Sequence, residues 1–206
     1  MAKAFRRQGK GADRRYVATL DADEREIVAT LMEQVADLLE APDVAGTGDA
    51  RFDAIVAGMT FSGDPHEATS RGRTAGGGQR DPALDRLLPT ANRQDPEAAD
   101  EFRHLTEGGI RHRKAAGLAA SVAAVRAASG DDVVLDADQS RAFLTALTDV
   151  RLVLGERLGL HTDEDVEAVE ARADSSDPDD PLVYAVALYD FLTWLQETLA
   201  TALLRR

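Results

Sequence analysis

The sequence DADQSRAFLTALTDVRLVLGERL, residues 136–158, decides the fold class of this chain. It begins with Asp136 and Gln139 at the spacing of a capping box, in which each side chain hydrogen-bonds the backbone N–H of the other residue. Its larger apolar residues recur every three or four positions and share one helix face: Phe143, Leu147, Val150, Leu154 and Leu158. The stretch therefore predicts an amphipathic helix with one face in a hydrophobic core.

Two upstream segments give further helix signals. Asp21 and Glu24 form a second capping-box pattern, ahead of apolar residues that repeat at helical spacing until Pro42. Pro82 suits the first turn of a short helix, which Pro89 ends. The first segment is therefore expected to be a helix, and the second a short connecting helix.

The longest helical segment runs from 96 to about 129. Gly108-Gly109 is expected to bend or break it, because Gly costs roughly 1 kcal/mol in a helix interior. Downstream, residues 163–171 predict an acidic helix, and a final helix from Leu182 is apolar nearly all round. Only a narrow polar stripe interrupts that helix: Asp190, Thr193, Glu197 and Thr201. We expect it to be the hub of the core or a dimer seam.

The N-terminal residues show a β pattern instead. Residues 4–8 and 14–20 flank the turn Gly9-Lys10-Gly11, and a brief extended stretch covers 133–135. Glycines crowd residues 62–81, which we expect to form a mobile loop. The predicted fold is mainly α, a helical bundle with a short N-terminal β-hairpin and a flexible Gly-rich loop. In domain terms, a basic hairpin arm over 1–20 packs on or leads into a single helical domain over 21–206.

Charge is distributed unevenly between this arm and the rest of the chain. Residues 1–20 carry six basic side chains against Asp13, a formal charge of +5, so the remainder carries −18 of the total −13. Five cations are candidate contacts to an anion or a partner: Arg6, Arg7, Lys10, Arg14 and Arg15. A body this acidic repels nucleic acid, while the arm could engage phosphate locally. Direct nucleic-acid binding stays open, as does the alternative that the cations only block edge pairing.

The composition excludes some chemistry outright. The chain has no Cys, so it has no disulfide, thiolate metal site or catalytic thiol. Its basic N-terminus lacks the apolar core of a signal peptide, and no apolar run approaches the ~20 residues of a membrane span. We expect a cytoplasmic protein that does not enter the membrane.

No compact catalytic or metal-binding motif is present. The strings of phosphate-binding loops, dinucleotide folds, zinc proteases and hydrolase elbows are all missing. The four histidines are scattered, and the acids over 174–180 miss the EF-hand spacing. We therefore assign no catalytic, cofactor-binding or metal-binding residue and expect no cofactor.

A group of charged residues on the last helices is a second candidate site. Asp149 and Arg151 lie within the apolar stretch over 136–158, and Arg151 is expected to pair with Asp190 or Glu197 in a buried charge network. The alternative is a pocket between helices around Arg151, to which His112 would also contribute, serving a small ligand or an enzyme reaction.

Three segments together resemble a known family: DPALDRLLPTANRQDPEAADEFR, VLDADQSRAFLTALTDVRLVLGERLGL and PLVYAVALYDFLTWLQETLATAL. It is an actinobacterial family of domains of unknown function, the one numbered two thousand seventeen. Members are often encoded beside the ClpS protease adaptor, and one, AosR, is described as an oxidative-stress transcriptional regulator acting with a sigma factor. The resemblance implies a protein partner in the transcription machinery or a protease-adaptor context. The redox switch of AosR depends on paired cysteines, which this chain lacks.

These observations favour regulation over catalysis. The leading hypothesis is a non-enzymatic regulatory or protein-interaction module, linked to transcription by the resemblance, with the basic arm assisting. If the arm binds DNA directly, binding is expected to be salt-sensitive and lost when residues 1–15 are deleted. A homodimer built on the final helix is a further alternative.

Overall fold

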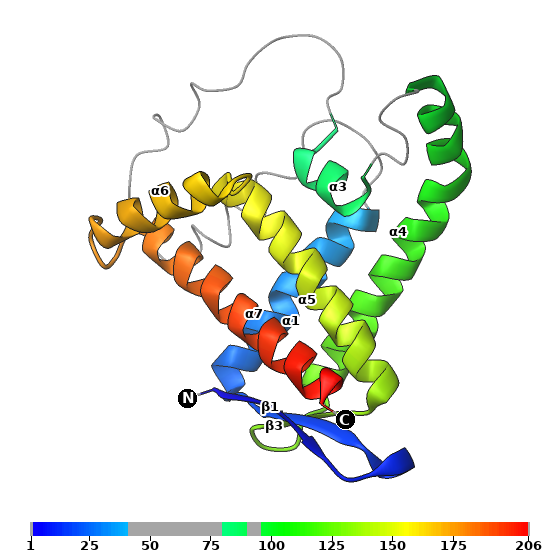
Figure 1. The fold of residues 1–206 in the computed structure, drawn as a ribbon, viewed down its shortest axis with the longest axis vertical. Helices are drawn as coiled ribbons and strands as arrows, with labels where there is room; N and C mark the ends of the chain where they lie inside the picture. Colours follow the sequence, from blue (N-terminus) through cyan, green and yellow to red (C-terminus); the bar gives the residue numbers. More distant parts are fainter. Residues whose placement is uncertain (1, 41–79, 90–95, 206) are drawn as a thin grey trace.

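The computed structural model describes residues 2–40, 80–89 and 96–205, with only the backbone for Ala12, residues 96–101 and His104. The mainly helical class is confirmed (Figure 1). In chain order the elements are β1 (Lys3–Gln8), a 3-10 turn (Gly11–Asp13), β2 (Arg15–Thr19), α1 (Ala22–Glu40), α3 (Pro82–Leu87), α4 (Pro96–Arg126), β3 (Asp132–Leu135), α5 (Ala137–Leu158), α6 (Asp163–Asp174) and α7 (Pro181–Leu204). The Gly-rich loop expected over 62–81 lies almost wholly outside the described residues.

Helix α5 is the centre of the fold, because α1, α3, α4 and α7 all pack against it (Figure 1). The predicted face is in the core, with Phe143, Leu147, Val150 and Leu154 buried. The expectation that the final helix is the hub is wrong. Helix α7 packs on α5, β1 and α6, whereas α5 contacts helices on several sides. Leu192, Leu195 and Leu199 of α7 are fully buried in the core, so α7 contributes one face to a core that α5 centres.

Both predicted capping boxes form. The backbone N–H of Asp136 donates to Gln139 Oε1 at 2.9 Å, and the N–H of Gln139 donates to Asp136 Oδ1 at 2.8 Å. At α1 the same pair of backbone-to-side-chain hydrogen bonds joins Asp21 and Glu24, and each of the two bonds is 2.9 Å long. A cap of this kind stabilises a helix by about 1 kcal/mol, which explains why both helices begin where the sequence indicates.

The N-terminal hairpin is confirmed, and the structure adds a third strand to it. Strand β2 lies in the middle of an antiparallel sheet of order β1-β2-β3, so the segment expected to be extended near residue 133 pairs with the hairpin. Phe5 and Tyr16 turn from the sheet into the core, and the Phe5 ring meets Phe143 edge-on at 5.9 Å between centroids. The hairpin is thus part of the hydrophobic core rather than a detachable arm.

Helix α4 is continuous through Gly108-Gly109, so the break that the sequence allowed for does not occur. The upper half of the helix curves (Figure 1). Two glycines cost roughly 2 kcal/mol relative to Ala, which the packing of a long helix against α1 and α5 can offset.

The tight turn between β1 and β2 requires Gly9. Its φ is +72°, and a Cβ there would lie 2.4 Å from the carbonyl oxygen of Asp13. Gly11 also has a positive φ, +60°, but a Cβ there would meet nothing within 4 Å. We expect Gly9→Ala to lower the free energy of unfolding by about 2–3 kcal/mol and Gly11→Ala by only about 1 kcal/mol. Denaturant unfolding of the two variants checks this, and equal losses would contradict it.

Candidate interaction surfaces

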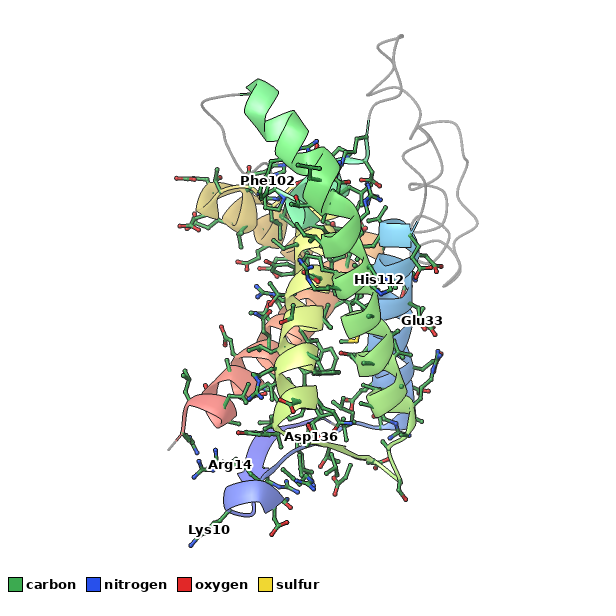
Figure 2. The ribbon with its side chains drawn as sticks, turned by 90° about the vertical axis from the view of Figure 1, so that its right-hand side faces the viewer. Lys10, Arg14, Glu33, Phe102, His112 and Asp136 are labelled. Carbon is green, nitrogen blue, oxygen red and sulfur yellow. The ribbon has the colours of Figure 1, made fainter. Side chains whose placement is uncertain are left out.

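Helix α4 has a second apolar face that the described residues leave uncovered. Figure 2 shows Phe102 near the upper end of α4 and His112 further along it. Phe102 is 52% exposed and Leu105 is 79% exposed. The exposed residues that follow are spaced alternately by three and four positions, and we call the whole set the α4 seam: Phe102, Leu105, Gly109, His112, Ala116, Ala119 and Ala123.

The opposite face of α4 makes the core contacts. Leu118, Val122 and Val125 are buried there, so α4 is apolar on two sides. An a/d spacing sustained over three heptads is typical of a helix that receives a partner helix, and small residues let two backbones approach closely. No expectation from the sequence covered this seam, although the 3-4 spacing from residue 102 to 123 was the available signal.

The structure divides the predicted hairpin cations between two sides of the sheet. Arg6 lies opposite Val17, and Val17 lies opposite Val134, so these three residues share the outer face. Arg15 is exposed and is paired in register with Gln8 on that face. Arg7 instead lies opposite Tyr16 on the inner face, where its guanidinium donates to the carbonyl oxygen of Arg205. The five cations therefore do not form one surface.

Lys10 and Arg14 lie in the turn between the two strands. Figure 2 shows both at the lower end of the molecule, with Lys10 pointing away from the helices. Lys10 is exposed, whereas Arg14 is half-buried and its Nε has no hydrogen-bond partner in the described part of the chain. Lys10 thus extends the outer face at the tip of the hairpin.

Asp149 is the most deeply buried acid of the described residues, at 2% exposure, and its partner is Lys114 of α4. Lys114 Nζ donates to Asp149 Oδ1 at 2.5 Å. Burial raises the pKa of Asp149, and the hydrogen bond and charge of Lys114 oppose that rise. The pair joins α4 to α5 inside the bundle and does not involve Arg151.

Arg151 is held by neutral groups of α7. Its Nη1 donates to Gln196 Oε1 at 2.8 Å and its Nη2 to Tyr189 Oη at 3.2 Å, while its Cζ lies 5.0 Å from the centroid of the Tyr189 ring. Gln196 in turn donates from Nε2 to Thr148 Oγ1 at 3.1 Å. These contacts tie α5 to α7 through hydrogen bonds and a cation–π interaction.

The remaining predicted site residues do not converge on Arg151. Asp190 and Glu197 are exposed on α7, and His112 is exposed on α4, which packs on the other side of α5 (Figure 1). Within the described residues no carboxylate contacts Arg151, so the expected pairing with Asp190 or Glu197 is not observed. The ion pair does not form because the carboxylates of Asp190 and Glu197 face solvent, where water hydrates them.

A charge cluster at the upper part of α4 centres on Glu107. Arg103 and Arg111 of the same helix pair with this carboxylate, and Arg80 joins them from outside the helix. Glu107 accepts hydrogen bonds from Arg80 and Arg111, at 2.9 and 2.8 Å. Burial raises the pKa of Glu107, but these two arginines more than offset it and hold the pKa below its usual value. The cluster fixes the segment before α3 against α4.

The described part of the chain contains neither a metal-binding cluster nor a membrane-spanning helix. No three His, Asp or Glu side chains in it are grouped so that they could hold a metal ion. In the same residues no helix has the length and apolarity needed to cross a membrane.

Comparisons with known proteins identify the family alone. No curated protein and no solved structure matches this chain. The model of a family described as Domain of unknown function (DUF2017) matches residues 2–203, nearly the whole sequence. This match agrees with the resemblance seen in the sequence segments of α3 to α7. The chain therefore belongs to the DUF2017 family.

Proposed function

We propose that this protein is a non-enzymatic regulatory module that binds a protein partner through the α4 seam. The exposure of Phe102 and Leu105 carries the proposal. Single exposed apolar residues are ordinary, but these two begin a stripe on a well-formed helix whose further members are the small residues Gly and Ala, with His112 as one polar member. A helical segment of a partner can bury such a stripe, with Phe102 and Leu105 as anchors and the alanines permitting close approach.

The resemblance to AosR supports a partner in the transcription machinery. Sensing would have to differ from that of AosR, because the present chain has no cysteine to oxidise. We therefore propose that recognition of the partner, and not thiol chemistry, is the regulated step. A polymerase subunit or a sigma factor is the expected partner, and a protease component is the second expectation from the ClpS context.

Affinity capture with Leu105→Glu tests the seam. The full chain is expected to enrich a polymerase subunit or sigma factor from a native extract, and Leu105→Glu is expected to reduce that enrichment at least roughly tenfold, because the seam would bury an uncompensated carboxylate. Leu204→Glu is the matched control, since Leu204 is 81% exposed at the far end of α7.

Folding of both variants is checked by thermal unfolding, where little change is expected at such exposed positions. Equal capture by Leu105→Glu and Leu204→Glu would remove the seam from the proposal. A wild-type chain that enriches no polymerase, sigma or protease component would contradict the regulatory role. Light scattering of the free protein shows whether a second copy occupies the seam instead.

A further inference from the structure

The outer face of the three-stranded sheet has a chemistry of its own, separate from the α4 seam. We propose that this face binds an acidic, extended polypeptide segment, with the hairpin cations pairing its carboxylates and Val134 contacting an apolar side chain. We call the surface the basic sheet face: Lys3, Arg6, Lys10, Arg15 and Val134. The proposal goes beyond the seam and does not depend on it.

The register places Arg6 and Lys3 on the same face as Val134, together with one acid. Arg6 is directly across from Val17, which is directly across from Val134. In the neighbouring row Lys3 is opposite Thr19, and Thr19 is opposite the exposed Asp132, whose carboxylate accepts a hydrogen bond from Thr19 Oγ1 at 2.9 Å. Val134 is 49% exposed on this face, whereas Val17 is buried between its neighbours. An extended chain presents alternate side chains to one side, so a carboxylate and an apolar group can reach Arg6 and Val134 together.

Three of these cations, Lys3, Arg6 and Lys10, are electrostatically available. Among the described residues no ion pair is formed by Lys3, Arg6 or Lys10. Several cations of the helical body are paired with acids, as shown by Arg126 with Glu33 at 2.5 Å. Further body pairs join Arg86 to Glu156, Arg157 to Asp81 and Arg25 to Asp131. A carboxylate that reaches Lys3, Arg6 or Lys10 therefore has no ion pair within the described residues to displace.

The surroundings favour an acidic peptide over nucleic acid. The two aromatic side chains of the sheet, Phe5 and Tyr16, turn into the core, so the outer face has no stacking platform for bases. A long duplex would also approach the acidic body, whose charge is −18 outside residues 1–20. Strand β3, which contains Val134, is one of the two edges of the sheet, and an edge strand can offer backbone hydrogen bonds to an extended chain.

Fluorescence anisotropy with the full-length protein tests the proposal. The probe is a short labelled peptide in which Glu and Val alternate, compared with a Glu-Ser peptide of equal charge and with a DNA strand of equal charge. We expect the Glu-Val peptide to bind best, with an affinity that falls as salt rises. Arg6→Glu is expected to weaken binding roughly tenfold, and Val134→Thr about threefold.

The matched control is Arg172→Glu, which makes the same charge change at an exposed position of α6, away from the sheet (Figure 1). It is expected to leave binding within about twofold of wild type, because the charge is distant and screened. Thermal unfolding shows that all variants fold. The proposal is overturned if the peptide does not bind at low salt, if Arg6→Glu and Arg172→Glu weaken it equally, or if the DNA strand binds more tightly.

Discussion

Replacing Lys114 with Met is expected to lower the free energy of unfolding by about 3 kcal/mol at neutral pH. The change leaves the carboxylate of Asp149 buried, at 2% exposure, without the ammonium that now lies 2.5 Å from it. An unpaired buried charge is far more costly than the pair was favourable, so most of the loss is the desolvation of Asp149. Urea unfolding of the two proteins measures the difference.

The dependence of that loss on pH has a definite sign. Burial raises the pKa of Asp149 in the folded protein, and without Lys114 the pKa rises further. A carboxyl whose folded pKa is raised favours the folded state below its unfolded pKa, and this contribution is lost as pH rises through the folded pKa. The defect of Lys114→Met is therefore expected to be small in acid and to grow toward neutral pH.

Two further variants isolate the cause. Adding Asp149→Asn to Lys114→Met removes the charge and is expected to recover stability at neutral pH and to flatten the pH dependence. Arg126→Met breaks an exposed pair with Glu33 and should change stability little, because exposed pairs are well hydrated. A loss that is independent of pH would mean that packing of the Lys114 stem, and not the buried charge, sets the effect.

Phe143→Ala is expected to lower the free energy of unfolding by about 4 kcal/mol, and Phe5→Ala by about 3 kcal/mol. Phe143 is 0% exposed and Phe5 is 5% exposed, and both belong to one core cluster. Phe5 lies within the segment that the sequence suggested could be deleted. We therefore expect removal of residues 1–15 to unfold the protein, which makes charge reversal the correct test of the hairpin cations.

A double-mutant cycle measures the ring contact directly. The two rings meet edge-on at 5.9 Å, and such pairs contribute about 1 kcal/mol beyond their buried area. The double variant should then lose about 1 kcal/mol less than the sum of the single losses. Leu105→Ala is the control, expected to be near neutral because Leu105 is 79% exposed. Exact additivity of Phe5→Ala and Phe143→Ala would show that the hairpin and α5 are not coupled.

The helices of this protein were predictable because their signals are local. The Asp136-Gln139 and Asp21-Glu24 caps act within one helical turn, and the periodic apolar residues of α5 specify a face wherever the helix is placed. The hairpin followed for the same reason, since Gly9 adopts a conformation that few other residues tolerate. These features depend only on residues that are close in the sequence, so they do not change with the way the helices and strands are arranged in space.

The candidate sites were less predictable, because they depend on which faces meet. The helical spacing in the sequence suggests Asp190 or Glu197 as the partner of Arg151. In the structure both acids of α7 are exposed to solvent, and Gln196 is the residue that accepts from the guanidinium. The sequence likewise could not assign Lys114 to Asp149, a contact between residues 35 positions apart. Side-chain pairing across helices follows from crossing geometry, which short-range patterns do not contain.

By itself, the sequence determined the helical class, the capped starts of α1 and α5, the hairpin and the absence of thiol chemistry. The tertiary structure alone decided that α5 is the hub, that β3 completes the sheet, and that the α4 seam and the basic sheet face are exposed. The physical reason is that the hydrophobic effect has no direction. An apolar stripe in the sequence shows that a helix face is favourable to bury, but the packing of the whole chain determines which faces are buried. In α4 one stripe is covered by α1 and α5, and the other is exposed among the described residues.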